Sequence, residues 1–256
     1  MNPPEAQAQV PQAKHAPAAR ELLHESGTTR VFRVRPPDGP AMVCKQPLGP
    51  AAPDRLRHEA RMLARLAGVQ GVPKLLAGPH PSGVIAFEDQ GGIPLPLALP
   101  RMGFDLPQVL SLALRLARIV AAMHRRGVLH QNINPANILL CEPQQEPLLI
   151  DFRLATTFAE GQPGFIHHRD IQGTLAYLAP EQTGRTGRAV DQRADLYSLG
   201  ATLYEMATGQ PPFDSKDALQ LIHDHLVREP IAPAQVDAGV PRGLSDIILR
   251  LLAKAP

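Results

Sequence analysis

The feature that most constrains the fold of this chain is a change of sequence pattern near residue 90. Before it, short β-like segments are separated by turn residues; after it, apolar residues recur at helical spacing. The change falls at "QGGIPLPLALP", a Gly- and Pro-rich stretch that breaks both patterns and is interpreted as a linker between two lobes. At 256 residues the chain is long enough for one large domain or for two lobes.

The first part of the chain is predicted to be a tail followed by a β-rich unit. Residues 1–18 are rich in Pro, Ala and Gln with almost nothing to bury, which predicts a disordered tail. Five segments then predict strands: "ELLHES", "TRVFRVR", "AMVCKQP", "VPKLLAG" and "GVIAFED".

One helix is predicted within the β-rich unit, and it carries a carboxylate on its apolar face. The stretch "DRLRHEARMLARLAG" ends at a Gly, a common helix stop. Glu59 precedes Met62, Leu63 and Leu66 by three, four and seven residues, which places it at the edge of their face. A carboxylate facing inward needs a partner because its desolvation is costly. The alternative, in which Glu59 reaches solvent, stays open on this pattern alone.

The second part is predicted to be mainly helical. A long helix with a broad buried face is expected over residues 107–126, followed by the strands "NILLC" and "PLLIDF". A loop rich in Gly and Thr spans 153–182, and "DLYSLGATLYEMATG" is apolar nearly all round, as expected of a core helix. Two more helices are expected within 215–228 and 243–254.

Composition argues against several classes of function. The formal net charge is +2 and the basic residues are scattered without interleaved aromatic residues, so no nucleic-acid surface is expected. Cys44 and Cys141 have neither disulfide nor metal-binding spacing and are expected to be buried thiols in a reducing compartment. No signal peptide is recognisable, and no apolar run reaches the roughly 18 residues of a membrane span. We therefore expect a cytoplasmic protein without membrane insertion.

The stretch "LHQNINPANILL", residues 129–140, is the most unusual local pattern. Its His, Asn and Pro residues form a polar run that leads directly into an aliphatic strand, an arrangement suited to holding a ligand at the mouth of the strand. Such loops often combine a His, a carboxylate and an Asn. Here Asn132 stands where a carboxylate is expected.

This loop is one of six motifs that resemble, in order, the eukaryotic-type Ser/Thr protein kinase family: "VCK", "HEARM", "HQNINPAN", "LLIDF", "GTLAYLAPE" and "DLYSLGATLYEMATGQPPF". The resemblance covers roughly residues 20–254. It implies an α+β, bilobal protein-kinase-like fold, with a small antiparallel β-lobe carrying one helix and a larger, mainly helical lobe. The domain would span 19–256, with the N-lobe at about 19–89 and the C-lobe at about 93–256.

The resemblance implies ATP and Mg²⁺ as cofactors and assigns a role to each motif residue. Lys45 resembles the strand lysine that grips the α- and β-phosphates, and Glu59 resembles its ion-pair partner. Asp151 and Asn137 match the oxygen ligands of the metal.

Other positions match supporting parts of the family's site. Gly27 lies in the loop that would cover the phosphates, and Glu88 and Gln90 fall where the hinge bonds adenine through its backbone. Asp195 resembles the buried Asp that ties the polar loop to the core helix, although a simple N-cap role stays open. Thr174 matches the serine/threonine kind of kinase.

Four departures from the family put catalysis in doubt. Asn132 replaces the catalytic Asp, and a neutral amide cannot act as a general base. Asn134 replaces the loop lysine that would face the γ-phosphate. Arg153 replaces the Gly of the Asp-Phe-Gly triplet and cannot take positive φ cheaply, which is expected to restrict switching of that loop. Gly27 stands alone in "HESGTTRVFRV", a weak version of a glycine-rich loop.

A narrower resemblance links the chain to the N-terminal kinase domain of very large bacterial signalling proteins. It rests on "INP", "LIDFRLAT" and "GTLAYLAPEQTGRTGRAVDQRADLYSLG". In that family an ATPase module, a sensor domain and a histidine kinase follow. The chain stops just before the Arg that would pair with the Glu matched by Glu181, so we expect a C-terminally truncated domain.

Three functions are weighed on these residues. The favoured one is an ATP-binding Ser/Thr kinase-like signalling domain whose phosphoryl transfer is weakened or lost, which acts on a regulatory protein partner or on downstream domains. The alternative is an active Ser/Thr protein kinase that transfers the γ-phosphate to protein hydroxyls. A small-molecule phosphotransferase shares a related loop, but "GTLAYLAPE" and the core helix after it argue against that class.

Overall fold

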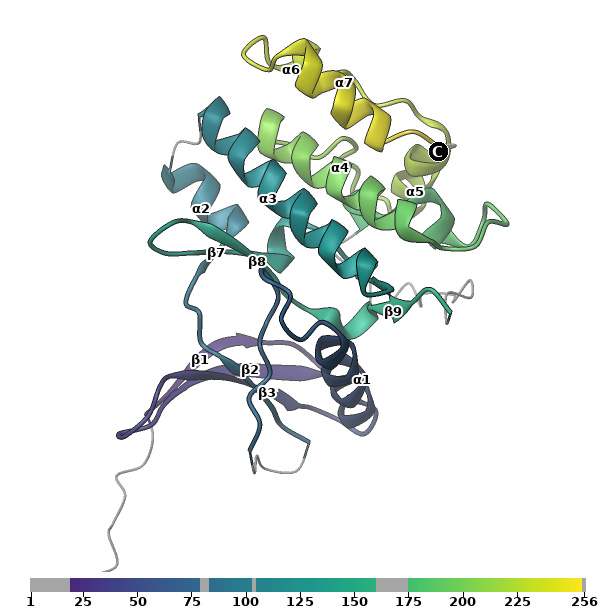
Figure 1. Cartoon of the computed structure of the whole chain (residues 1–256). Helices are drawn as coiled ribbons and strands as arrows, with labels where there is room; N and C mark the ends of the chain where they lie inside the picture. Colours follow the sequence, from purple (N-terminus) through teal and green to yellow (C-terminus); the bar gives the residue numbers. More distant parts are fainter. Residues whose placement is uncertain (1–18, 79–82, 103–104, 160–174, 255–256) are drawn as a thin grey trace, which may run out of the picture.

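The computed structural model describes residues 19–78, 83–102, 105–159 and 175–254. Within them the chain forms two lobes, with a sheet and one helix at one end and a helical bundle at the other (Figure 1). The expected α+β bilobal fold is therefore confirmed. The predicted tail at 1–18 and Thr174 lie outside the described residues.

The small lobe is an antiparallel sheet in which the strands follow one another in the order β1-β2-β3-β4. They are β1 (Ala19–Glu25), β2 (Thr29–Arg35), β3 (Met42–Pro47) and β4 (Ile85–Glu88). Lys45 stands on the inner strand β3, between Val31 of β2 and Ile85 of β4. A strand paired on both sides fixes this lysine firmly in the sheet.

The segment "VPKLLAG" was expected to be a strand, and this expectation is wrong. It makes only a single bridge, between Leu75 and Phe87 of β4. The Leu76 N–H donates to the Ala86 carbonyl and the Glu88 N–H donates to the Lys74 carbonyl, each at 2.9 Å; these two bonds flank the single bridge.

Helix α1 (Ala52–Arg65) packs its apolar face against the sheet and the large lobe. Leu56, Met62 and Leu63 on this face are buried, and Glu59 is buried among them with 2% of its surface exposed. The ring Nε2 of His58 lies 2.6 Å from the Ala155 carbonyl oxygen of the large lobe. This contact holds α1 in the position that turns Glu59 inward.

The stretch predicted to be a linker contains two further elements, β5 (Ile93–Pro94) and α2 (Leu95–Met102). The alternating Leu and Pro residues mask a helix that buries Leu95 and Ala98, with Pro96 tolerated in its first turn. The actual linker is shorter. At Gly92, which has φ +114°, an added Cβ would lie 3.1 Å from Leu139 Cβ, so the close approach of the two chain segments requires glycine.

The large lobe is built on α3 (Leu106–Arg125) and α4 (Gln192–Thr208), which pack against each other. Asp105 caps α3 in a reciprocal capping box with Gln108. Around them lie α5 (Ala218–Val227), α6 (Pro233–Val236) and α7 (Arg242–Leu251). The four-residue α6 was not predicted because it is too short to show a period.

By length and composition alone α3 is apolar enough to cross a membrane, contrary to the expectation that no apolar run reaches the length of a span. In the fold, its Leu112, Leu116 and Val120 are buried, and the helix packs against α4 and β8. A core helix of a globular lobe meets the same criterion, so hydropathy alone is weak support for a span.

Short strands carry the polar loop into position. The loop of residues 130–137 follows β6 (Val128–Leu129) and ends in a 3-10 turn, η1 (Pro135–Asn137). After it come β7 (Ile138–Cys141) and β8 (Glu146–Leu149), which form one sheet with β5. Strand β6 pairs with β9 (Thr156–Thr157). The loop and the end of β8 therefore open toward the small lobe.

Candidate active site

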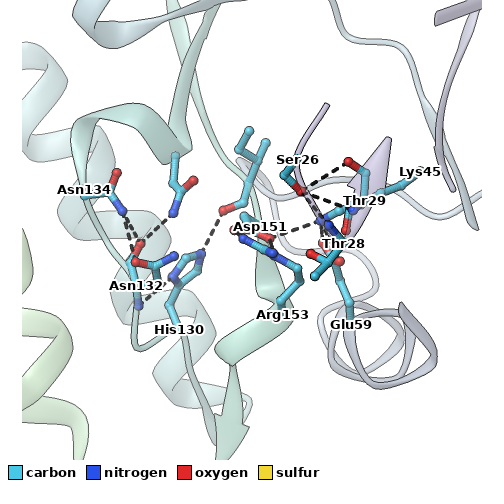
Figure 2. A network of polar contacts seen from close by, with 12 residues as sticks. Ser26, Thr28, Thr29, Lys45, Glu59, His130, Asn132, Asn134, Asp151 and Arg153 are labelled. Atoms are coloured by element: carbon cyan, nitrogen blue, oxygen red, sulfur yellow. Dashed lines mark hydrogen bonds and ion pairs between the residues drawn. The ribbon is translucent and has the colours of Figure 1, made fainter. Parts of the chain in front are cut away.

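Side chains from both lobes meet where β3 and α1 face the end of β8. Figure 2 shows the residues of the 130–137 loop on one side and Lys45 with Glu59 on the other, with Asp151 and Arg153 between them. These residues come from four separate parts of the chain.

The predicted ion pair between Lys45 and Glu59 is present. Lys45 Nζ lies 2.9 and 2.7 Å from the two Glu59 carboxylate oxygens. Burial raises the pKa of Glu59, and the lysine charge opposes that rise. The alternative in which Glu59 reaches solvent is wrong, because Glu59 is buried and its carboxylate is paired with Lys45 instead.

Asp151 follows β8 in a left-handed backbone conformation, with φ +69° and ψ +68°. Its Oδ1 accepts a further hydrogen bond from Lys45 Nζ at 3.1 Å. The next residue, Phe152, is fully buried and packs edge-on against the His130 ring. The strained conformation of Asp151 therefore turns its carboxylate toward Lys45 while Phe152 fills the core.

Arg153 does not adopt the positive φ that its position in the motif had suggested. It lies in the 3-10 turn η2 (Phe152–Leu154) and has no positive φ. Its effect is electrostatic instead, because its Nε and Nη2 donate to the two oxygens of Asp151 at 2.6 and 2.8 Å. Burial would raise the pKa of Asp151, but Lys45 and Arg153 together hold it well below its usual range.

The 130–137 loop is held by its own asparagines. The Asn132 carbonyl oxygen accepts from Asn134 Nδ2 and from Asn137 Nδ2, each at 2.9 Å. Asn134 Nδ2 also donates to Asn132 Oδ1 at 3.2 Å, and Asn134 Oδ1 caps η1 by accepting from the Ala136 N–H. Asn134 is buried and occupied within the loop, so it supplies no charge to the site.

Asp195, in the first turn of α4, ties the loop to the core helix. Its Oδ1 accepts from the Gln131 N–H at 2.8 Å, and its Oδ2 accepts from the His130 N–H at 2.9 Å and pairs with His124 Nε2 at 2.8 Å. The N-cap of α4 is Asp191, so the alternative of a cap role for Asp195 is wrong.

Two residues of this anchor were missed by sequence reasoning. His124 lies in the last turn of α3 and pairs with Asp195, and Gln182 Nε2 donates to the Gln131 carbonyl at 2.8 Å. That bond supports Gln131 at its positive φ of 61°. Only the place of Gln182 directly after "APE" could have drawn attention to it.

The turn between β1 and β2 is closed on itself. Ser26 Oγ accepts from the Thr29 N–H at 3.1 Å and from the Thr28 N–H at 3.4 Å. An added Cβ at Gly27 would meet nothing within 4 Å, so no close approach requires glycine there. The N–H groups of Thr28 and Thr29 are therefore used within this turn.

The two hinge residues, Glu88 and Gln90, differ in which of their groups already have partners within the chain. The Glu88 N–H donates to the Lys74 carbonyl at 2.9 Å, and its side chain pairs with Lys74 on the surface. The Gln90 side chain faces away from the site and lines a separate cavity of about 850 Å³, formed with α3, β7 and β8. The Glu88 N–H is therefore already used within the chain.

Glu181 lies buried in the 3-10 turn η5 (Pro180–Thr183). No ion pair to it is present in the described residues. Burial raises its pKa above the ordinary value, and its own backbone N–H and the nearby charges of Arg188 and Arg193 counter this only in part.

The folded chain therefore holds the Glu181 proton more tightly than the unfolded chain does. Glu181 favours folding at low pH, and this contribution is lost as the pH rises through the raised pKa. We expect Glu181→Gln to increase the free energy of unfolding at neutral pH by about 1–3 kcal/mol. The gain should vanish in acid, as measured by thermal melts across pH. Glu142→Gln, at an exposed carboxylate, is the control; equal pH curves for wild type and Glu181→Gln would contradict the argument.

Comparison with known proteins gives the same family. The model of the protein kinase domain matches residues 95–256. The serine/threonine-protein kinase PknB of Mycobacterium tuberculosis is 29% identical over 240 residues, which cover 93% of this chain and 37% of PknB. The chain belongs to the protein kinase family.

Other bacterial relatives agree. The serine/threonine-protein kinase PkaA of Streptomyces coelicolor is 38% identical over 147 residues, 57% of this chain and 26% of PkaA. A probable serine/threonine-protein kinase of Clostridium perfringens is 29% identical over 205 residues, 79% of this chain and 29% of the relative. The chain spans well under half the length of these curated relatives.

The side chains present fit the two expected cofactors unequally. Lys45, held by Glu59, is a buried cation suited to phosphate oxygens. Asn137 and Asp151 offer the oxygen atoms that Mg²⁺ prefers. Both Asp151 oxygens, however, already accept from Arg153. The site thus fits a nucleotide better than it fits the metal.

Proposed function

We propose that this chain is an ATP-binding Ser/Thr kinase-like signalling domain in which phosphoryl transfer is weakened or lost. The observation that carries the proposal is the state of Asn132. Its amide stands in the position of the general base, and its Oδ1 accepts from Asn134. A neutral amide takes no proton from an acceptor hydroxyl.

The remaining residues support binding of a nucleotide rather than its turnover. ATP supplies the phosphoryl group in this family. Glu59 orients the Lys45 ammonium, and Asp195 fixes the shape of the loop from behind. Glu88 and Gln90 stand where the family's hinge bonds adenine through its backbone. None of these groups requires a base at position 132.

The alternative is an active Ser/Thr protein kinase. It is favoured by the complete Lys45–Glu59 pair and by the left-handed Asp151, which turns its carboxylate toward the lysine. Positioning and charge neutralisation supply most of the catalysis of phosphoryl transfer, so a site without its base retains part of the rate. Turnover of the wild-type chain on a generic basic protein distinguishes the two.

The partners in this proposal are ATP and a protein, which is either a substrate, a regulatory partner or a domain downstream in a larger signalling protein. We propose a cytoplasmic location without nucleic acid or membrane insertion. The two cysteines, both buried and free, suit a reducing compartment. The relatives that are named as serine/threonine-protein kinases support the protein partner.

The test is thermal stabilisation by ATP. We expect ATP to raise the melting temperature of the wild type, and Lys45→Met to abolish the shift because the phosphates lose their buried cation. Combining Lys45→Met with Glu59→Gln avoids an unpaired buried carboxylate. Lys216→Ala, at an exposed lysine of the large lobe, is the control. An unchanged ATP shift in the Lys45 variants would refute binding at this site.

A further inference from the structure

The carboxylate of Asp151 is enclosed by two cations from the chain itself. Arg153 Nε donates to Oδ1 at 2.6 Å and Arg153 Nη2 donates to Oδ2 at 2.8 Å, so the guanidinium binds both oxygens in parallel. Lys45 Nζ approaches Oδ1 at 3.1 Å from the other side. Figure 2 shows Arg153 lying directly against Asp151.

The local backbone makes this contact possible. The left-handed Asp151 and the 3-10 turn after it place residues 151 and 153 on one side of the chain. The guanidinium is a planar fork that matches the two oxygens of a carboxylate, whereas an ammonium makes a single point contact. A glycine at position 153 would leave both oxygens with no partner from this turn.

Arg153 also balances the charge of the site. Two cations, Lys45 and Arg153, face two carboxylates, Glu59 and Asp151. The 130–137 loop adds neutral amides at 132, 134 and 137. Without Arg153 the cluster would hold one unbalanced negative charge, which an external cation would have to neutralise.

A divalent metal needs the oxygens that Arg153 occupies. Mg²⁺ binds carboxylate oxygens at about 2.0–2.1 Å with near-ideal geometry. Each carboxylate oxygen has two lone pairs; Arg153 and Lys45 use both on Oδ1, and Arg153 uses one on Oδ2. A guanidinium so close also repels the incoming ion. The side chain of Asp151 is only 13% exposed, so solvent screens this repulsion little.

We propose that Arg153 takes the place of the divalent cation at Asp151, so that this site binds a nucleoside triphosphate without metal. The proposal rests on the ATP binding proposed above and adds which form of the ligand is bound. Because Arg153 neutralises Asp151, the triphosphate meets no unbalanced carboxylate there and needs no metal ion between them. Arg153 acts as a specificity-determining residue for metal-free nucleotide.

The test is the affinity for a fluorescent ATP analogue, measured in excess EDTA and in excess Mg²⁺. For the wild type we expect nearly equal dissociation constants in the two buffers. For Arg153→Gly we expect Mg²⁺ to tighten binding by at least about tenfold, or roughly 1.4 kcal/mol. Arg153→Lys keeps the charge without the fork and is expected to fall between them.

A second measurement detects the metal directly. The electron paramagnetic resonance signal of Mn²⁺ with ATP should change on adding Arg153→Gly protein, which immobilises the ion, and should not change on adding wild type. Wild-type binding that requires Mg²⁺, or Mn²⁺ immobilised by the wild type, overturns the proposal. If neither the wild type nor Arg153→Gly binds nucleotide in either buffer while both melt cooperatively, the proposed ATP binding is refuted. The present inference is then refuted as well, because it rests on that binding.

Discussion

Asn132→Asp is expected to raise the rate of phosphoryl transfer by about two to four orders of magnitude in a chain that also carries Arg153→Gly. The aspartate restores a base beside the acceptor hydroxyl, and the glycine frees Asp151 from the guanidinium that now binds both its oxygens. Each change supplies something the other cannot. The increase should therefore be much smaller for Asn132→Asp alone.

The measurement is transfer of labelled phosphate from ATP to a generic basic protein by the wild type, both single variants and the double variant. Asn132→Ala in the Arg153→Gly background is the matched control, because it also removes the amide without adding a base. Equal gains for Asn132→Asp with and without Arg153 would show that the guanidinium does not limit catalysis. Brisk turnover by the wild type would contradict the view of Asn132 as disabling.

Asn134→Lys should add to the double variant by placing a charge near the transferred group, where stabilisation of developing charge is a large catalytic effect. The gain should not be strictly additive, since Asn134 Nδ2 donates to the main-chain oxygen of Asn132 and Asn134 Oδ1 caps the turn that follows by accepting from the Ala136 N–H. The lysine removes both contacts.

The second large effect is expected at Asp195, where Asp195→Asn should lower the free energy of unfolding by about 3–5 kcal/mol. Asp195 has no exposed surface, and its oxygens serve donors from three residues. An amide turns an NH₂ toward donors that need an acceptor, so at least one of them is left without a partner.

Asp191→Asn is the matched control for this substitution. Asp191 caps the same helix from the surface, where Asn serves nearly as well, so we expect a change below about 0.5 kcal/mol. Chemical denaturation of the two variants gives the comparison. If Asp195→Asn and Asp191→Asn lowered the free energy of unfolding by similarly small amounts, Asp195 would not be the anchor of the loop.

The fold was predictable where the pattern was long and regular. The helix at 107–126 lies within one residue of its predicted bounds, because its period is sustained and Asp105 caps it. The elements that were missed are short or masked by Pro: α6, with four residues, and α2 inside the supposed linker. Such segments take their structure from packing against the rest of the lobe, which local sequence does not encode.

The site was predictable only in part, for a related reason. Lys45, Glu59 and Asp151 were matched by the order of motifs, and the structure brings them together from three elements. The ion pair of Arg153 was not foreseen, because it depends on the left-handed backbone at Asp151. The residue type at 153 predicted a backbone cost that the structure does not show, and it did not predict the contact that the arginine makes.

Asp195 holds the backbone of the 130–137 loop through residues other than the one at the position of the general base. The main-chain N–H groups of His130 and Gln131 are fixed from α4, so a change of the side chain at 132 removes one hydrogen bond within the loop but leaves this anchor in place. A lineage that stops needing turnover can therefore change the tip of the loop while the surface offered to a partner is inherited intact. Such a chain would keep the ability to bind a protein partner after its catalytic activity had been lost.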